Sequence, residues 1–154
     1  MELTIEQALQ RGIAAHKEGK LQAAEQLYRV ILQSHPAHPD ANHNLGVLAV
    51  SVNKAEAALP LFEAALKGNP KIEQFWLSYA DALIKTDKFD IARQIVEQAK
   101  TQGVDEERLK LLQTELEAAA KFHKSQSNDQ TKALKLSGKR KKSAKRKKSE
   151  TASR

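Results

Sequence analysis

Apolar side chains recur along residues 5–104 at spacings of three and four positions, and short polar breaks interrupt this pattern. The spacing places apolar residues on one face of a helix, so it predicts a series of amphipathic helices. The breaks at residues 18–20, 52–54 and 86–88 are typical of tight turns between antiparallel helices. We therefore predict an all-α fold built from helical hairpins.

The pattern repeats at an interval of about 34 residues, which is the distance from Gly12 to Gly46. Shifting the chain by this interval places small residues on small residues and large apolar residues on large apolar residues. The aligned sets are Gly12, Gly46 and Ala80; Ala24, Ala58 and Ala92; Tyr28, Phe62 and Val96; and Pro36 with Pro70. Small residues let two helices approach closely, and the large residue fills the space beside them. The chain is predicted to hold three hairpins, at about residues 5–38, 39–72 and 73–104.

These positions resemble the tetratricopeptide repeat, a helical hairpin of about 34 residues, and the similarity covers residues 5–104. The middle unit matches most fully, through Leu45, Gly46, Ala58, Phe62, Ala65 and Pro70. The first unit has Ala8 and Arg11 where the family favours a large aromatic residue and leucine, and the third ends at residues 103–104 without a proline. Terminal repeats commonly depart in this way, because they lack one neighbour. The resemblance implies a right-handed α-solenoid of three helix-turn-helix hairpins.

Local signals mark individual helix ends. Thr4 followed by Gln7 predicts a capping box, and Pro39 suits the first turn of the third helix. Pro60 conflicts with the second helix of the middle unit, because an interior proline removes a backbone hydrogen bond. That helix is therefore expected either to bend near Glu56 or to begin later.

A last helix is expected over residues 105–123. Acidic residues occupy its first turn, and Leu109, Leu112 and Leu116 share one face. Such a helix is the solvating cap that stacked repeats require.

The first helix of each hairpin lines the concave side of such a solenoid, where extended or helical peptides bind. The resemblance therefore implies a protein-interaction module that holds a peptide or helix of a protein partner in an apolar groove. The expected groove residues are Glu6, Leu9, Ile13 and Lys17; His43, Asn44, Val47 and Val50; and Gln74, Leu77, Asp81 and Ile84. A competing interpretation is that the apolar members only seal the packing between units.

One ligand class of the family is disfavoured. Members that grip a C-terminal carboxylate use Lys and Asn on the first helix, Asn on the third, and Lys and Arg on the fifth. The matching positions here are Leu9, Ile13, Asn44, Gln74 and Ser78. Only Asn44 is retained, and no cation occupies these positions to neutralise a carboxylate.

Charge divides the chain into two segments. Residues 1–120 carry 13 Lys/Arg and 17 Asp/Glu, a net charge of −4, whereas residues 121–154 carry a net charge of +11. Residues 124–154 are polar and basic with few apolar residues, so this tail is expected to be disordered. The expected anion-binding residues are Lys139, Arg140, Lys141, Lys142, Lys145, Arg146, Lys147 and Lys148.

Several roles for the tail stay open. It could be a linker or a nonspecific tether to anionic surfaces. It could also bind nucleic acid without sequence preference, bind anionic lipid, or act as a nuclear import signal in a eukaryote. The architecture also looks like the front part of larger bacterial proteins that end in a glycosyltransferase, sulfotransferase or methyltransferase. Under that interpretation the chain is expected to be a truncated N-terminal arm that binds a substrate or partner and lacks the catalytic domain.

Catalysis is not expected from this sequence. It has no Gly-rich phosphate loop, nucleophile elbow or HExxH helix, and no cysteine. His35, His38 and His43 lie near Asp40, but we interpret them as loop and capping residues. We therefore predict no catalytic residue, cofactor or metal. Because no stretch is typical of a signal peptide or a membrane span, a cytoplasmic location is expected, or a nuclear one in a eukaryotic cell.

Overall fold

The computed structural model describes residues 2–151 of the chain and the side chains of residues 2–139. Its helices are α1 (Ile5–Lys17), α2 (Leu21–Ser34), α3 (Pro39–Ser51), α4 (Ala55–Gly68), α5 (Glu73–Lys85), α6 (Phe89–Thr101) and α7 (Glu106–Thr151). Two compact units divide the chain, the first ending at Glu117 and the second beginning at Ala118.

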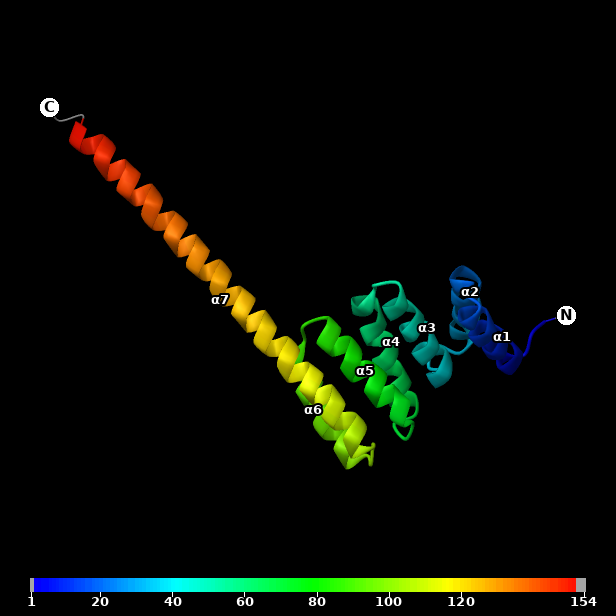
Figure 1. Ribbon diagram of the computed structural model, residues 1–154. Helices are drawn as coiled ribbons and strands as arrows, with labels where there is room; N and C mark the ends of the chain where they lie inside the picture. The colour runs from blue at the N-terminus through cyan, green and yellow to red at the C-terminus, as the bar shows by residue number, and fades with distance from the viewer. Residues whose placement is uncertain (1, 152–154) are drawn as a thin grey trace. The chain divides into compact units, whose positions relative to one another are not determined.

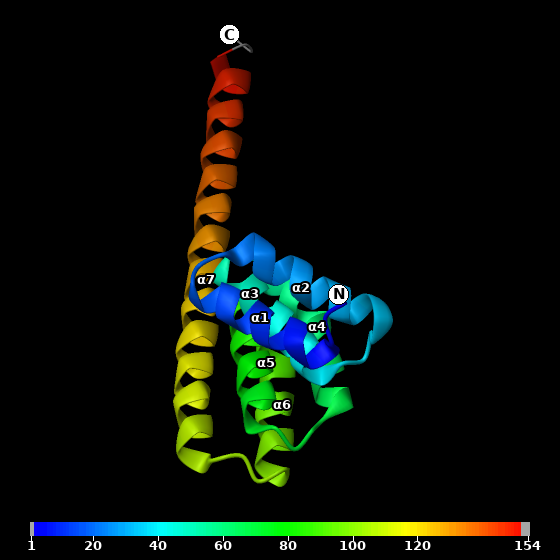
Figure 2. The same cartoon turned by 90° about the vertical axis from the view of Figure 1, so that its right-hand side faces the viewer.

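Helices α1 to α6 form three hairpins in which consecutive helices pack side by side (Figures 1 and 2). Contacts between α2 and α3, and between α4 and α5, join each hairpin to the next. Buried residues from α1, α2 and α3 share one core cluster, and Leu61 of α4 packs against it. The core therefore runs along the stack, and the predicted all-α solenoid of three hairpins is confirmed.

A close contact between a glycine and an aromatic ring lies within each of the first two hairpins. A Cβ atom added at Gly46 would lie 2.6 Å from a ring carbon of Phe62, and one added at Gly12 would lie equally close to Tyr28. Both rings are almost fully buried. At the equivalent positions the third hairpin has Ala80, which is larger than glycine, and Val96, which is smaller than phenylalanine or tyrosine.

The three hairpin turns use one backbone conformation. Gly19, Asn53 and Asp87 occupy equivalent positions in the three repeats and all have positive φ angles, of 77°, 62° and 58°. In each case the N–H of the following lysine donates to a carbonyl five residues back, at 2.8 Å. This geometry is the Schellman motif, which ends a helix by satisfying its last carbonyl groups.

The connection between hairpins is also repeated. The side chains of Asn42 and Trp76, which hold equivalent positions in successive repeats, donate hydrogen bonds to the carbonyls of Pro36 and Pro70, at 3.0 and 2.8 Å. Each bond ties the start of one hairpin to the end of the preceding one. Ala8 holds the same position in the first unit and has no such donor.

The predicted helix ends are present. Thr4 and Gln7 form the capping box of α1, and Pro39 is at the start of α3. Helix α4 begins at Ala55 and contains Pro60, so the alternative that this helix begins after the proline is wrong. The bend near Glu56 stays a prediction.

The start of α7 caps the first unit. Leu109, Leu112 and Leu116 are buried, as predicted for a capping helix. Arg93 of α6 donates two hydrogen bonds to the carboxylate of Glu117, at 3.0 and 3.3 Å.

The helix does not end near residue 123 but continues to Thr151. Lysine, alanine and glutamine are good helix formers, and extending an existing helix needs no new nucleation. All described side chains from 121 to 139 are exposed, so this segment forms no packed core.

Candidate functional site

The structure places many of the expected groove residues inside the array. Leu9, His43 and Ile84 are buried, with exposed fractions of 5%, 9% and 8%. Val47 and Val50 are half-buried against the core cluster formed by α3, α4 and α5, and Ile13 packs against the cluster of the first hairpin. Several apolar members therefore take part in packing between helices. Asn44, Leu77 and Asp81 are half-buried, whereas Glu6, Lys17 and Gln74 are exposed.

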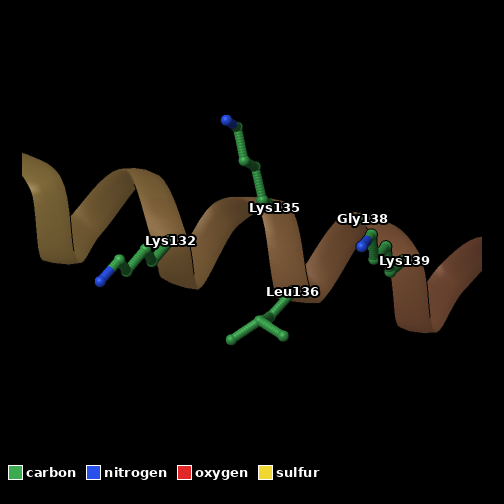
Figure 3. Close-up of a pocket in the computed structure, with 5 residues that line it drawn as sticks. All are labelled: Lys132, Lys135, Leu136, Gly138 and Lys139. Atoms are coloured by element: carbon green, nitrogen blue, oxygen red, sulfur yellow. The ribbon is translucent and has the colours of Figure 1, made fainter.

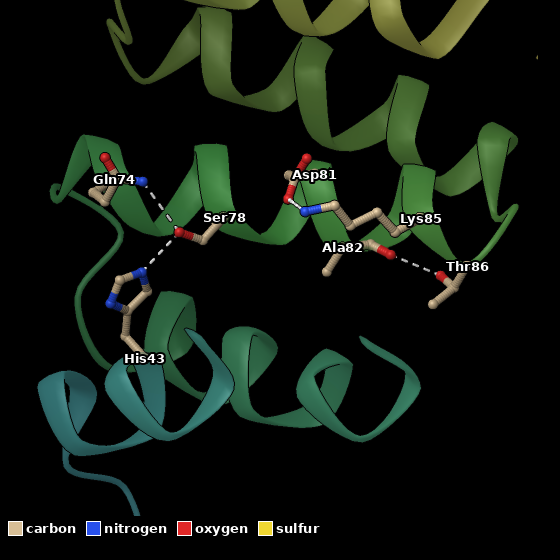
Figure 4. A network of polar contacts seen from close by, with 7 residues as sticks. All are labelled: His43, Gln74, Ser78, Asp81, Ala82, Lys85 and Thr86. Atoms are coloured by element: carbon tan, nitrogen blue, oxygen red, sulfur yellow. Dashed lines mark hydrogen bonds and ion pairs between the residues drawn. The ribbon is translucent and has the colours of Figure 1, made fainter. Parts of the chain in front are cut away.

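His43 joins the second hairpin to the third (Figure 4). Its Nε2 atom lies 2.8 Å from the hydroxyl of Ser78 on α5, and this hydroxyl also accepts a hydrogen bond from Gln74 at 3.2 Å. The imidazole stacks on Phe75, with ring centroids 4.7 Å apart, and lies beside Phe62. Burial lowers the pKa of His43, and the nearby Asp40 carboxylate opposes this shift. Because burial favours the uncharged imidazole, His43 links the second and third hairpins through its hydrogen bond and ring contacts.

An open groove lies between α5 and the first turns of α7, within the first unit. Its volume is about 500 Å³, and its lining residues are Gln74, Leu77, Ser78 and Asp81 of α5, and Arg108, Leu111, Leu112 and Glu115 of α7. Leu111 is 69% exposed, unlike the buried Leu112 beside it. Three expected groove residues, Gln74, Leu77 and Asp81, are thus brought together.

Helix α7 supplies one wall of this groove, which the repeat pattern over residues 5–104 did not predict. One repeat after Gln74, Leu77 and Asp81, the equivalent positions hold Arg108, Leu111 and Glu115. Extending the repeat by one helix would have found them. Helix α7 occupies the place of a first helix in a further hairpin, and so it both caps the array and lines the groove.

Charges of both signs border this groove. Lys85 pairs with Asp81 at 2.7 Å, and Arg108 lies 3.9 Å from Glu73. Glu115 has no ion pair or hydrogen bond within the described part of the chain. Arg108 also places a cation in the same groove as Gln74 and Ser78. These are two of the positions that hold Lys and Arg in the family members that bind a C-terminal carboxylate.

A second hollow, of about 610 Å³, lies between the beginning of α1 and the end of α2. Leu3, Ile5, Leu27 and Val30 are among its lining residues, and Val30 is 57% exposed. The periodicity did not predict this hollow. Leu27 and its equivalent in the second repeat, Leu61, both pack against the core cluster of α1, α2 and α3, and Leu27 also lines this hollow.

The histidines between the first two hairpins have separate roles. His38 caps α3 by accepting a hydrogen bond from the Ala41 N–H, and His35 contacts the Ser34 hydroxyl. Among the described residues, no three metal-ligating side chains are close enough to hold an ion. In the same part of the chain, no helix is both long and apolar enough to cross a membrane.

In the second unit, Lys132, Lys135, Leu136, Gly138 and Lys139 border a shallow hollow on one stretch of α7 (Figure 3). Lys139 is exposed, as are all its described neighbours. The other expected anion-binding side chains lie outside the described residues; these are Arg140, Lys141, Lys142, Lys145, Arg146, Lys147 and Lys148.

Comparisons with known proteins agree with this architecture. Residues 49–116 match the tetratricopeptide-repeat family. A structure titled MamA MSR-1 C2 is 26% identical with a TM-score of 0.58, over 65% of this chain and 57% of that chain. This chain therefore spans less than two thirds of that relative. No curated protein sequence matches it.

Two further structures show the same fold at lower identity. The complex of the TPR2B domain of yeast Sti1 with pHsp70 is 15% identical with a TM-score of 0.68, over 74% of this chain and 96% of that chain. An O-GlcNAc transferase mutant of Thermobaculum terrenum is 20% identical with a TM-score of 0.59, over 66% of this chain and 20% of that chain.

Proposed function

We propose that this tetratricopeptide-repeat protein is a protein-interaction module that holds a peptide or helical segment of a partner in the groove between α5 and α7. The observation that carries the proposal is the exposure of Leu111, at 69%, on the wall of an open groove of about 500 Å³. Two structural neighbours support it: the TPR2B domain of yeast Sti1 is in complex with pHsp70, and the first TPR of Spaghetti (RPAP3), which is 18% identical with a TM-score of 0.66, is bound to an HSP90 peptide.

The groove has the size and lining of a binding site for side chains. Its volume of about 500 Å³ falls within the range of roughly 300 to 1,000 Å³ typical of ligand pockets. Leu77, Leu111 and Leu112 give it an apolar strip that a leucine or aromatic side chain of the partner would cover.

The charges at the groove favour a ligand with two kinds of polar group. Arg108 at the start of α7 offers a guanidinium to a carboxylate, and Glu115, two turns later, offers a carboxylate to a cation. A ligand that is acidic at one end, apolar in the middle and basic at the other end satisfies both. These opposite charges set the direction in which the segment binds.

The first two hairpins contribute less to this site than the sequence suggests. Leu9 and His43 occupy the positions that correspond to Leu77 and Leu111, but both are buried against neighbouring helices. Of these four equivalent positions, only Leu77 and Leu111 contribute apolar surface to an open groove, and they lie on α5 and α7.

The experiment compares capture of partners by the parent chain and three variants of it. The variants are Leu111→Glu, alone and with Leu77→Glu, and the control is Ile91→Glu, which alters an exposed apolar residue of α6 outside the groove. Partners are captured from lysate at about 0.3 M salt after nuclease treatment, so that the basic tail contributes little. Quantitative mass spectrometry then compares the partners captured by the parent chain and by each variant.

We expect at least one partner that is retained by the control and reduced about tenfold or more by Leu111→Glu. A carboxylate in an apolar contact costs more than the roughly 1.4 kcal/mol that corresponds to tenfold. If the double variant captures the same partners in the same amounts as the parent chain, the groove is not the binding site.

A further inference from the structure

We propose that residues 118–151 form a second binding site, separate from the groove, for the phosphate backbone of double-stranded nucleic acid. The segment 118–154 contains 13 Lys/Arg and 2 Asp/Glu, a net charge of +11. The first unit, residues 1–117, has a net charge of −4. Polyanion binding is therefore confined to one part of the chain.

The described lysines of this segment are available to a ligand. Lys121, Lys124, Lys132, Lys135 and Lys139 are exposed, and none of them has a partner within the described residues. The acids of the first unit are often paired, for example Glu25 with Arg29 and Glu97 with Lys100, each within a single helix. The tail thus carries uncompensated charge.

The helix arranges part of this charge in a strip. Lys132, Lys135 and Lys139 are separated by three and four residues, so they lie on the same side of α7. The strip is about 10 Å long, from a rise of 1.5 Å per residue, and one strand of a duplex places a phosphate every 3.4 Å or so along the axis. Three lysines can therefore reach neighbouring phosphates together.

Holding these lysines on one helix face also costs free energy in the free protein. Like charges three or four residues apart repel each other and weaken a helix. Asp129 is the only acid between residues 118 and 139, so there is little internal compensation. A phosphate backbone removes this repulsion, and binding therefore favours the helical form of the segment.

The distribution of apolar residues favours nucleic acid over a membrane surface. Leu134 and Leu136 are 74% and 62% exposed, and their spacing of two residues places them on opposite sides of the helix. In Figure 3, Lys135 and Leu136 leave the helix in different directions. Among the described side chains of residues 118–139, no continuous apolar face could enter the headgroup region, as a membrane-bound amphipathic helix needs.

The same residues favour duplex over single-stranded nucleic acid. Proteins that bind single strands stack successive bases on several aromatic side chains. Phe122 is the only Phe, Tyr or Trp in residues 118–154. The segment can bind mainly through its Lys and Arg charges, and a duplex has a greater density of phosphates than a single strand. The duplex is therefore the favoured ligand. Binding is expected to be independent of sequence.

The experiment measures the affinity of the full chain for two fluorescent 20-base-pair DNA duplexes of unrelated sequence, by anisotropy, between 50 and 200 mM salt. If six to ten cations contact phosphates, log K falls against log salt with a slope of about −5 to −9, and affinity drops by about a thousandfold or more. Equal affinity for both duplexes is expected. A slope shallower than about −2 would overturn the proposal.

A pair of triple variants tests the location of the site. Replacing Lys132, Lys135 and Lys139 together by glutamine should reduce the steepness of the slope by about 2 to 3. The control replaces three exposed lysines of the first unit by glutamine; these are Lys17, Lys54 and Lys71. It changes the net charge of the protein by the same amount and should leave the slope unchanged. Equal effects of the two triple variants would contradict the proposal.

Two comparisons complete the test. Vesicles containing phosphatidylserine should bind more weakly than duplex DNA at equal phosphate concentration, and stronger binding to vesicles would favour a lipid ligand and refute the assignment. Leu111→Glu should leave the affinity for DNA unchanged, because the groove belongs to a different site. Loss of DNA binding in that variant would show that the two sites are not separate.

Discussion

The contact between Gly46 and Phe62 gives the sharpest test of the hairpin packing. A Cβ atom at position 46 would lie 2.6, 2.9 and 3.0 Å from three carbons of the Phe62 ring. That ring is 1% exposed, so it cannot turn out into solvent. Overpacking of this kind typically costs about 1 to 3 kcal/mol, and replacing glycine by alanine in a helix returns about 1 kcal/mol. We expect Gly46→Ala to lower the free energy of unfolding by about 1 kcal/mol.

The third hairpin supplies the compensating change. It has Ala80 and Val96 at the positions of Gly46 and Phe62. Phe62→Val alone should cost about 2 to 4 kcal/mol, because it leaves a cavity beside His43. The double variant Gly46→Ala with Phe62→Val should be more stable than the sum of the two single effects by about 1 kcal/mol or more.

Urea unfolding followed by circular dichroism and by Trp76 fluorescence measures these effects. Trp76 is 7% exposed and is the only tryptophan, so its emission reports on the array. Gly138→Ala is the matched control, because a Cβ atom added at Gly138 meets no neighbour. If Gly46→Ala unfolds at the same urea concentration as the parent chain or at a higher one, the two helices are not as close as described. Strict additivity in the double variant would refute the compensation.

Two further predictions concern the middle hairpin. Burial lowers the pKa of His43, so the unfolded chain binds more protons than the native protein at acidic pH. The contribution of His43 to the free energy of unfolding should therefore be complete above about pH 6.5, the pKa of the unfolded chain, and should be lost as the pH falls toward the native pKa. Urea midpoints at pH 8 and pH 5.5 should differ less for His43→Gln than for the parent, and equal differences would show that other groups cause the loss. Pro60 is exposed in the interior of α4, where it removes the hydrogen bond to the Glu56 carbonyl, so Pro60→Ala should raise the free energy of unfolding by up to about 3 kcal/mol. Lower thermal stability of Pro60→Ala would show that the proline ring makes a favourable contribution.

Local rules were sufficient for much of the fold. The capping box of Thr4 and Gln7 depends on residues three positions apart, and the turn at Gly19 on a single backbone conformation. The pairing of Gly12 with Tyr28 follows from a period that the sequence repeats. Such features are readable because the residues that make them are close in sequence or recur at a fixed interval.

The groove was less readable, because exposure depends on which helix is packed alongside. The sequence does not distinguish His43 from Leu77 as members of a concave surface, yet His43 is buried against Phe75 while Leu77 borders open space. It also assigned the start of α7 to a capping role alone, although Leu111 and Glu115 of that helix complete the groove.

The amino-acid sequence by itself determined the helices, their pairing into hairpins and the division of charge between an acidic array and a basic tail, since these follow from local pattern and composition. Only the tertiary structure decided which apolar side chains stay uncovered. That property belongs to a pair of neighbouring helices, α5 and α7, and the packing of each hairpin on the next leaves Leu111 exposed while it buries Leu9 and Ile84.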